Sequence, residues 1–375
     1  MKVLIAPNAF KGSLDAVAAA EAIQRGLEMS HLKPTCLPQP IADGGDGMLE
    51  VMLAQTDSQK LYATVEDPLG RPVKAAYGLI QDGKVAVIEM AEASGLRLLS
   101  SNERDPRKTS TFGTGQLILE ALAQGVEEIV LGVGGSATVD GGLGIVQALG
   151  AKLTDKKGNK IPRGADGLAV LQNIDASGLD ERLPHCIITV PCDVTNTLVG
   201  AAEVFGPQKG ASPELVAEIE RYFLNYSNLV KEHLEKDIAH LPRGGAAGGV
   251  AAALYAFLNA KLVNGTEFLL SKSGFHTALH QADLLITTEG ALDRQTQEGK
   301  GPFYVAQQAK AQGKSVIMLV GSVPQDYSPQ DYSDYDAILP IGPRPQPLEE
   351  ALMHTAQNLE RTAYQIGNML TIKKP

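Results

Sequence analysis

The chain has 375 residues, which exceeds the usual limit for a single hydrophobic core and predicts two domains. Its apolar fraction of 44% and charged fraction of 20% exclude a disordered chain. A formal net charge of −10 without a Lys/Arg-rich block argues against nucleic-acid binding. No apolar run reaches eighteen residues, which argues against a membrane span.

The cysteine pattern favours a reducing compartment. Cys36, Cys186 and Cys192 are an odd number and lack the short spacing of a metal motif, so we expect buried free thiols. The opening segment MKVLIAPNAF is interrupted by polar residues and by Pro7, which is typical of a first strand and not of a signal peptide. We therefore expect a cytoplasmic protein.

The N-terminal part alternates strand and helix. A strand is predicted over residues 2–6, followed by a helix from Leu14 to Met29 with Ser13 as its N-cap. A second short strand ends at PIADGGDG, and a helix over 48–54 follows it. This order of elements predicts a parallel sheet.

The middle of the chain changes pattern. Residues 60–91 alternate polar and apolar, with turn signals at DPLG and QDGK, and this predicts an antiparallel hairpin or meander. Beyond them we predict helices over 115–124, 141–149 and 213–235, strands over 127–133 and 186–191, and a buried helix in GGAAGGVAAALYAFLNA.

From about residue 264 the alternation of strand and helix returns. The predicted elements are a helix over 270–281, the strand ADLLITTEG, a helix over 302–312, the strands SVIMLVGS and DAILPI, and a final helix over 347–368. Three strands here and two at the N-terminus predict a flavodoxin-like doubly wound parallel sheet assembled from both chain ends. We place this discontinuous domain at 1–56 plus 263–375, with a second α/β domain inserted over 57–262.

Glycine and carboxylates are concentrated in loops that follow predicted strands. The chain has 39 glycines, about a tenth of its residues against an average near 7%. Doubly wound sheets bind ligands in these loops, at the carboxyl ends of their strands. Gly-Gly pairs and Asp beside Gly also occur in simple turns and helix caps. Their recurrence favours a ligand site, and the loops are PNAFKGS, ADGGDG, GVGGSATVDGG, PCDVTN and TTEGALDRQTQEGKGP.

These residue types are the ones that phosphoryl transfer requires. It needs carboxylates on Mg²⁺, backbone amides at helix N-termini around phosphates, a Lys or Arg, and often an Asp that accepts a proton. The loop GVGGSATVDGG offers consecutive amides before a predicted helix, so we expect it to bind the phosphates through Gly134, Gly135, Ser136 and Thr138.

Standard nucleotide motifs are absent from the sequence. The segment GLIQDGK, Gly78–Lys84, is the nearest match to a P-loop, but Val85 stands where Ser or Thr should be and the segment falls in a hairpin. No GxGxxG follows a strand in the required register, which weakens the alternative of a nucleotide-dependent oxidoreductase.

Ten ordered sequence blocks resemble those of the bacterial glycerate kinase family, the single-chain, two-domain type. They run from end to end of the chain: APNAFKGSL, PIADGGDG, EDPLGRPV, IEMAEASGL, TSTFGTGQLILEAL, LGVGGSATVDGGLGIVQALG, PCDVTNTLVGAAEVFGPQKGAS, GGAAGGVAAALYAFLNA, ITTEGALDRQTQEGKGP and LVGS. The resemblance implies transfer of the γ-phosphate of ATP to D-glycerate with Mg²⁺, giving the 2- or the 3-phosphate, in a cleft between the two domains.

Two alternatives stay open beside this expectation. One is a kinase for another small hydroxy acid or sugar acid, and the other is a non-catalytic ligand-binding relative. Such a relative would be expected to have lost its carboxylates, whereas this chain keeps Asp43, Asp46, Asp193 and Asp293.

Candidate roles fall on the matched motifs. Asp193 or Asp293 is expected to accept the hydroxyl proton, with the other on Mg²⁺. Lys11 and Arg71 are candidates for the glycerate carboxylate or the phosphates, although a solvated turn residue explains Arg71 equally well. The remaining candidates are Lys300 for a phosphate, Asp43 and Asn196 for the substrate, and Asp46 and Glu289 for the metal. A homodimer is the expectation from the frequency of such assemblies.

Overall fold

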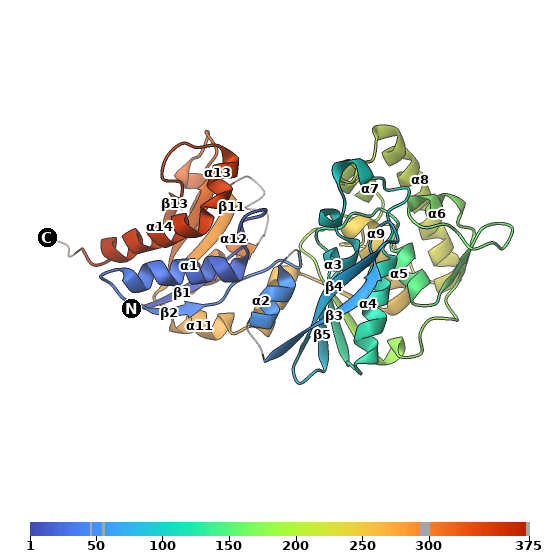
Figure 1. Ribbon diagram of the computed structural model, residues 1–375, viewed down its shortest axis with the longest axis horizontal. Helices are drawn as coiled ribbons and strands as arrows, with labels where there is room; N and C mark the ends of the chain where they lie inside the picture. Colours follow the sequence, from blue (N-terminus) through green and yellow to red (C-terminus); the bar gives the residue numbers. More distant parts are fainter. Residues whose placement is uncertain (46, 55–56, 293–300, 373–375) are drawn as a thin grey trace. The chain divides into compact units, whose positions relative to one another are not determined.

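The computed structural model describes residues 1–45, 47–54, 57–292 and 301–372. The chain divides into two compact units, which Figure 1 shows. Unit 1 comprises Met1–Asp43, Glu50–Gln55 and Thr266–Pro375, and unit 2 comprises Gly44–Leu49 and Thr56–Gly265. Both ends of the chain thus lie in unit 1.

Unit 1 contains a parallel sheet, in which five strands of the described ranges follow the order β13-β12-β11-β1-β2. Numbered along the chain, this is the flavodoxin order 2-1-3-4-5, and it confirms the predicted fold class. The strands are β1 (Lys2–Pro7), β2 (Thr35–Pro38), β11 (Leu284–Ala291), β12 (Ser315–Ser322) and β13 (Ala337–Pro340).

Helices cover both faces of this sheet. Val3 and Ile5 of β1 belong to a core cluster with α1 and α14, whereas Leu4 and Ala6 belong to another with α11 and α12. Alternate residues of a strand point to opposite faces, so the apolar run of β1 is buried on both sides. The described α-helices that lie wholly or mostly in this unit are α1 (Ala16–Met29), α10 (Gly265–Lys272), α11 (Phe275–Gln281), α12 (Gly301–Ala311), α13 (Leu348–Met353) and α14 (Thr355–Met369).

The prediction of Ser13 as a helix cap is wrong. The cap of α1 is Asp15, whose carboxylate accepts a hydrogen bond from the Ala18 N–H at 2.8 Å. A tight turn between Phe10 and Leu14 precedes the helix and delays its start. The Ser13 hydroxyl instead bonds to residues that flank the start of α14.

Two predicted helices are each divided. The helix expected over 270–281 is α10 (Gly265–Lys272) and α11, because the Ser273 hydroxyl accepts the Phe275 N–H at 3.1 Å and starts a new helix. The helix expected over 347–368 is α13 and α14, separated at His354. Ser273 and Gly274 are residues that often interrupt a helix. The apolar periodicity on both sides of them nevertheless favoured one continuous helix in the prediction.

Unit 2 contains a mixed sheet. In the part of the chain that the structure describes, its order is β10-β9-β6-β5-β4-β3, with β3, β4 and β5 antiparallel as the meander predicted and the other pairs parallel. The strands are β3 (Ser58–Glu66), β4 (Pro72–Ile80), β5 (Val85–Glu89), β6 (Glu128–Gly132), β9 (Ile187–Pro191) and β10 (Lys261–Val263). A separate antiparallel pair, β7 (Lys152–Thr154) and β8 (Asn173–Asp175), was not predicted.

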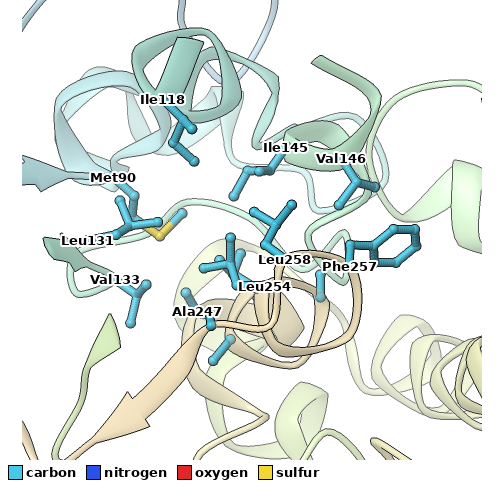
Figure 2. Packing of buried hydrophobic residues seen from close by; sticks show 14 of the residues in the cluster. Met90, Ile118, Leu131, Val133, Ile145, Val146, Ala247, Leu254, Phe257 and Leu258 are labelled. Atoms are coloured by element: carbon cyan, nitrogen blue, oxygen red, sulfur yellow. The ribbon is translucent and has the colours of Figure 1, made fainter. Parts of the chain in front are cut away.

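The core of unit 2 lies between its sheet and its helices. Figure 2 shows part of it, with Met90, Ile118, Leu131, Val133, Ile145, Val146, Ala247, Leu254, Phe257 and Leu258 labelled. The helices are α3 (Ala91–Ser94), α4 (Phe112–Ala123), α5 (Leu143–Ala148), α6 (Ala165–Val170), α7 (Ala201–Phe205), α8 (Pro213–Leu234) and α9 (Ala246–Leu258). Helix α2 (Met48–Ala54) spans the boundary between the units, and the Leu49 N–H donates to the Glu89 carboxylate at 2.7 Å.

The start of α9 differs from the predicted continuous helix. Ala247, Gly248 and Gly249 have left-handed backbone angles, with φ of 55°, 68° and 92°. A Cβ on Gly248 would lie 2.4 Å from the Thr138 carbonyl oxygen, and the Gly141 N–H donates to the Gly248 carbonyl at 3.0 Å. This Gly-rich turn therefore packs directly against the loop that contains Thr138, which a regular helix could not do.

Cys36, Cys186 and Cys192 are all described and form no disulfide, as expected. Cys186 and Cys192 are buried, whereas Cys36 in β2 is only half-buried. Among the described helices, none combines the length and the apolar character that crossing a membrane requires.

Candidate functional site

In unit 1 three candidate residues follow or end adjacent strands. Lys11 comes after β1, Asp43 comes after β2, and Glu289 lies near the end of β11, while β1 pairs in parallel with both of the other strands. The carboxyl ends of parallel strands meet at one edge of a sheet, so the topology brings these residues to the same edge. Asp43 and Glu289 are half-buried, and Lys11 is exposed without a hydrogen-bond or ion-pair partner among the described residues.

In unit 2 the adjacent strands β6 and β9 are followed by the other candidate loops. Gly44, at the start of the unit 2 segment Gly44–Leu49, contacts both of them. Its carbonyl accepts the Gly134 N–H at 3.4 Å, and a Cβ added to it would lie 2.3 Å from the Pro191 carbonyl oxygen. Its φ of 84° also favours glycine. The ADGGDG motif thus needs glycine at this position for backbone packing.

The glycine loop, defined here as Val133–Gly142, is held from one side by the segment after β5. The Ala137 N–H donates to the Ser94 carbonyl at 2.9 Å, and the Leu96 N–H donates to the Gly135 carbonyl at 2.8 Å. The Thr109 hydroxyl donates to the Ala137 carbonyl at 3.0 Å. These bonds fix the backbone of the loop.

Two successive amides of the glycine loop stay available. The N–H groups of Gly135 and Ser136 have no acceptor in the described part of the chain, while the Gly134 N–H donates to Gly44. Gly135 has a left-handed φ of 68°. Successive amides around a left-handed residue form an anion-binding concavity. Gly135 and Ser136 therefore have the geometry expected of a phosphate-binding site, whereas the Thr138 hydroxyl is fully buried.

Asp140 has a structural task within the same loop. Its carboxylate accepts hydrogen bonds from the N–H and the hydroxyl of Thr111, both at 2.9 Å, from the Gly142 N–H at 3.0 Å and from the Gly144 N–H at 3.3 Å. Burial raises the pKa of Asp140, and these donors oppose that rise. The carboxylate thus joins the glycine loop to α4 and to the first turn of α5.

Lys209 is a residue that the sequence analysis did not select. It is 2% exposed, and its Nζ donates to the Ser136 hydroxyl oxygen at 2.8 Å and to the Thr138 carbonyl at 2.7 Å. Burial lowers the pKa of Lys209 to about 7, with the charge of Asp140 acting in the opposite direction. It lies more than seventy positions from the loop that it contacts, so no local pattern could have revealed the contact.

Asp193 and Asn196 lie in the loop after β9. The half-buried Asp193 accepts the Gly265 N–H at 2.7 Å, and the main-chain carbonyl of Asn196 accepts the Gly245 N–H at 2.9 Å. The Arg243 guanidinium donates to the Cys192 carbonyl at 3.1 Å, which adds a further tie to this loop. Both candidates are therefore positioned by backbone contacts in the loop that follows β9, the strand that pairs with β6.

Arg71 is engaged in ion pairs within the turn after β3. Its Nε lies 2.6 Å from the Asp67 carboxylate, and a terminal nitrogen lies 2.5 Å from that of Glu103. These pairs raise the pKa of Arg71, and hydrogen bonds from the N–H and the hydroxyl of Ser100, followed by that from Arg71, lower the pKa of Glu103. The role of a turn residue accounts for the observed contacts of Arg71.

Arg104 is a second arginine near this turn in the sequence, and its buried Nε has no acceptor among the described residues.

The remaining candidates cannot be placed. Asp46, Asp293 and Lys300 lie outside the described residues. Within those that are described, no group of three or more His, Cys, Asp and Glu side chains has the arrangement of a metal site. The half-buried carboxylates of Asp43, Asp193 and Glu289 are oxygen donors of the kind that Mg²⁺ prefers.

Fold and loops together define an α/β enzyme with an amide-lined glycine loop and carboxylates at strand ends, a combination that suits a small-molecule phosphotransferase. The model of the glycerate kinase family matches residues 3–371. The chain is 44% identical to the Glycerate 2-kinase of Escherichia coli K12, covering 99% of this chain and 98% of the relative. It is 43% identical to the Glycerate kinase of Halalkalibacterium halodurans, with 97% of each chain covered.

A solved structure agrees with these relatives. A crystal structure from Salmonella typhimurium LT2 that carries the name glycerate kinase 2 has a TM-score of 0.86 and 44% sequence identity, and the match covers 99% of this chain and 98% of that one. The chain belongs to the glycerate kinase family. It is an enzyme that phosphorylates glycerate, and the prediction of a glycerate kinase is confirmed.

Proposed function

We propose that this enzyme transfers the γ-phosphate of ATP to the 2-hydroxyl of D-glycerate in the presence of Mg²⁺. The observation that carries the phosphate-binding part is the pair of available amides at Gly135 and Ser136, at the end of a buried parallel strand. Amides at strand ends are well suited to phosphate oxygens because each N–H donates without bringing a mobile side chain. The choice of the 2-hydroxyl rests on the name of the Escherichia coli relative.

Asp193 is the proposed proton acceptor for the glycerate hydroxyl, with Asp293 as the alternative. The Gly265 N–H occupies one oxygen of Asp193 at 2.7 Å and fixes the orientation of its carboxylate. A carboxylate that is held in one orientation is a suitable group to accept the hydroxyl proton. Lys11, an exposed ammonium, is the proposed cationic contact for a phosphate or for the glycerate carboxylate.

Mg²⁺ fits the donor chemistry of the candidate residues. Asp43 and Glu289 are the described carboxylates that we propose to hold it, and Asp46 belongs to the same motif as Asp43. When bound, Mg²⁺ would neutralise charge on the phosphate oxygens. The chain's own residues would position the phosphates and hold the hydroxyl proton.

The position of the new phosphate can be read directly from the product. We expect the purified protein, given D-glycerate and Mg·ATP, to form a phosphoester whose phosphorus-31 spectrum shows coupling to the single proton on carbon 2. Coupling to the two protons on carbon 3 would contradict the choice of hydroxyl and leave the kinase assignment intact. A panel of other small hydroxy acids and sugar acids tests the alternative substrates, any of which would have to surpass glycerate in kcat/KM to replace it.

A further inference from the structure

Lys209 is a buried ammonium that the proposed reaction does not yet use. It sits in a short 3-10 turn, Pro207–Lys209, followed by Gly210 with a φ of 94°. A Cβ on Gly210 would lie 2.2 Å from the Arg104 carbonyl oxygen, so the turn is fixed against its neighbour. From this anchored position the side chain reaches the glycine loop at two points.

We propose that Lys209 is a positioning residue for the nucleotide: its ammonium holds Ser136 and Thr138 so that the amides of Gly135 and Ser136 stay available to a phosphate group. This rests on the proposed function, in which those amides bind ATP. The contacts carry the inference, since Nζ bonds to the hydroxyl of Ser136, whose own N–H is one of the open amides, and to the carbonyl of Thr138 two residues further on.

The charge of Lys209 indicates a role beyond filling space in the core. Removing an ammonium from water is costly, and an apolar side chain of similar volume is often as stable at a buried position. Its Nζ has no carboxylate within ion-pair distance among the described residues, and Asp140 acts on it only from further away. The contacts that the buried cation makes in return are its hydrogen bonds to two acceptors of the glycine loop, Ser136 and Thr138.

The third donor of Lys209 strengthens the link to an anion. An ammonium has three N–H groups, and those bonded to Ser136 and Thr138 leave one with no oxygen or nitrogen acceptor in the described chain, while the Phe205 ring centre lies 6.0 Å from Nζ. A positive charge bonded to the side chain of Ser136 would also add a favourable potential for a phosphate at these amides in a water-poor environment. Positioning and charge therefore act on the same ligand.

The test compares Lys209→Met and Lys209→Gln with the wild-type enzyme. Methionine keeps most of the volume without donors, and glutamine keeps neutral donors. We expect kcat/KM for ATP to fall by on the order of 10²-fold in the methionine variant, since small misplacements of binding groups have effects of this size. The KM for glycerate should change little, because the displaced loop contacts the nucleotide.

Lys236→Met provides a matched control. Lys236 is a partly buried lysine of the same unit whose Nζ donates to the Tyr255 carbonyl at 2.8 Å and to the Asn259 side chain at 2.5 Å. Its bonds are of the same kind, but they lie at the end of α9 and not on the glycine loop. This variant should keep the wild-type KM for ATP.

Three results decide the matter. A folded Lys209→Met variant with wild-type KM and affinity for ATP would overturn the proposal. Activity that falls with the folded fraction alone, at an unchanged KM for ATP, would show a purely structural role and would also overturn it. If the wild-type protein neither binds ATP nor phosphorylates glycerate, the proposed function fails first, which the same assays reveal.

The wild-type enzyme supplies a second test should both variants fail to fold. The pKa of Lys209 is about 7, so the ammonium is lost as pH rises above that value. Asp140 on the loop is the charged group that acts on Lys209, and Tyr226 of α8 lies near the loop at Gly141; burial raises the pKa of both. We expect KM for ATP to rise by up to about tenfold per pH unit above pH 7.5, with KM for glycerate unchanged. A flat KM for ATP would contradict the proposal.

Discussion

Asp140 and Asp193 are carboxylates with different tasks, and their surroundings separate them. Asp140 is fully buried, and its oxygens accept from Thr111, Gly142 and Gly144. Asp193 is half-buried and accepts from Gly265. A fully buried carboxylate that binds several backbone donors is suited to hold a loop, whereas a half-buried carboxylate can be reached by a substrate.

Asp193→Asn should lower kcat by on the order of 10²-fold or more, because the amide cannot accept the hydroxyl proton. The asparagine oxygen can still accept the Gly265 N–H, so the melting temperature should stay near that of the wild type. Steady-state kinetics with saturating glycerate and Mg·ATP measure the effect. An Asp193→Asn variant with full kcat would exclude Asp193 as the base and leave Asp293 as the candidate.

Lys209 predicts a pH dependence of stability. The side chain holds its proton up to about pH 10.5 in the unfolded chain but only to about pH 7 when folded. Between these values the unfolded state binds more protons, so the free energy of unfolding contributed by Lys209 rises with pH, by up to about 1.4 kcal/mol per unit. Urea denaturation at about pH 7 and pH 9 should show this gain in the wild type and not in Lys209→Met. An equal pH response of the two proteins would contradict the lowered pKa.

At the scale of elements, the start of α9 packs against the glycine loop, which lies about a hundred positions earlier in the sequence. The left-handed segment at the start of α9 contacts the backbone of the glycine loop through Gly248 and Gly141. Asp140 of the loop also accepts the Gly144 N–H, and Leu254 of α9 belongs to the hydrophobic core of unit 2. The shape of the glycine loop thus depends on α9, although α9 contributes none of the candidate ligands.

Gly248→Ala should disturb both stability and nucleotide binding. The new Cβ would meet the Thr138 carbonyl at 2.4 Å with φ at 68°, so strain and overlap add. We expect a loss of about 2–4 kcal/mol in the free energy of unfolding, combining a left-handed alanine with overpacking. The control is Gly83→Ala, with φ of 80° and open space around its Cβ, which should lose only about 1–2 kcal/mol. Equal losses in the two variants would show that contact with Thr138 does not matter.

The elements could be predicted from sequence where a pattern is local. The meander of β3, β4 and β5 and the parallel strands of unit 1 follow from residue alternation and buried apolar runs. The short strands β7, β8 and β10 carry too few residues to show a period. The start of α9 looks helical because alanine has a high helix propensity, yet its conformation is set by packing against the glycine loop.

The candidate site could be predicted only in part for a similar reason. Its loops can be recognised in the sequence because Gly and Asp cluster after predicted strands. In the structure the glycine loop has available amides at Gly135 and Ser136. The ion pair of Arg71 with Glu103 and the contacts of Lys209 join residues 32 or more positions apart and leave no local signal, whereas Asp67 lies in the same turn as Arg71.

At the scale of the whole molecule, the chain supplies two sets of polar loops on two sheets. One set follows the strands of a flavodoxin-order sheet formed from both chain ends, and the other follows β6 and β9 of a mixed sheet. Membership of the glycerate kinase family agrees with this arrangement over nearly the full length of the chain. The proposed ATP, Mg²⁺ and residue roles extend that assignment to a mechanism.

The most direct test of the account is a coupled assay of ADP release by the wild-type protein with D-glycerate and Mg·ATP. The account predicts glycerate-dependent ADP formation, which stops when glycerate, ATP or Mg²⁺ is left out, and a matching yield of phosphoglycerate. Failure to form ADP with glycerate, by a protein shown to be folded, would contradict it.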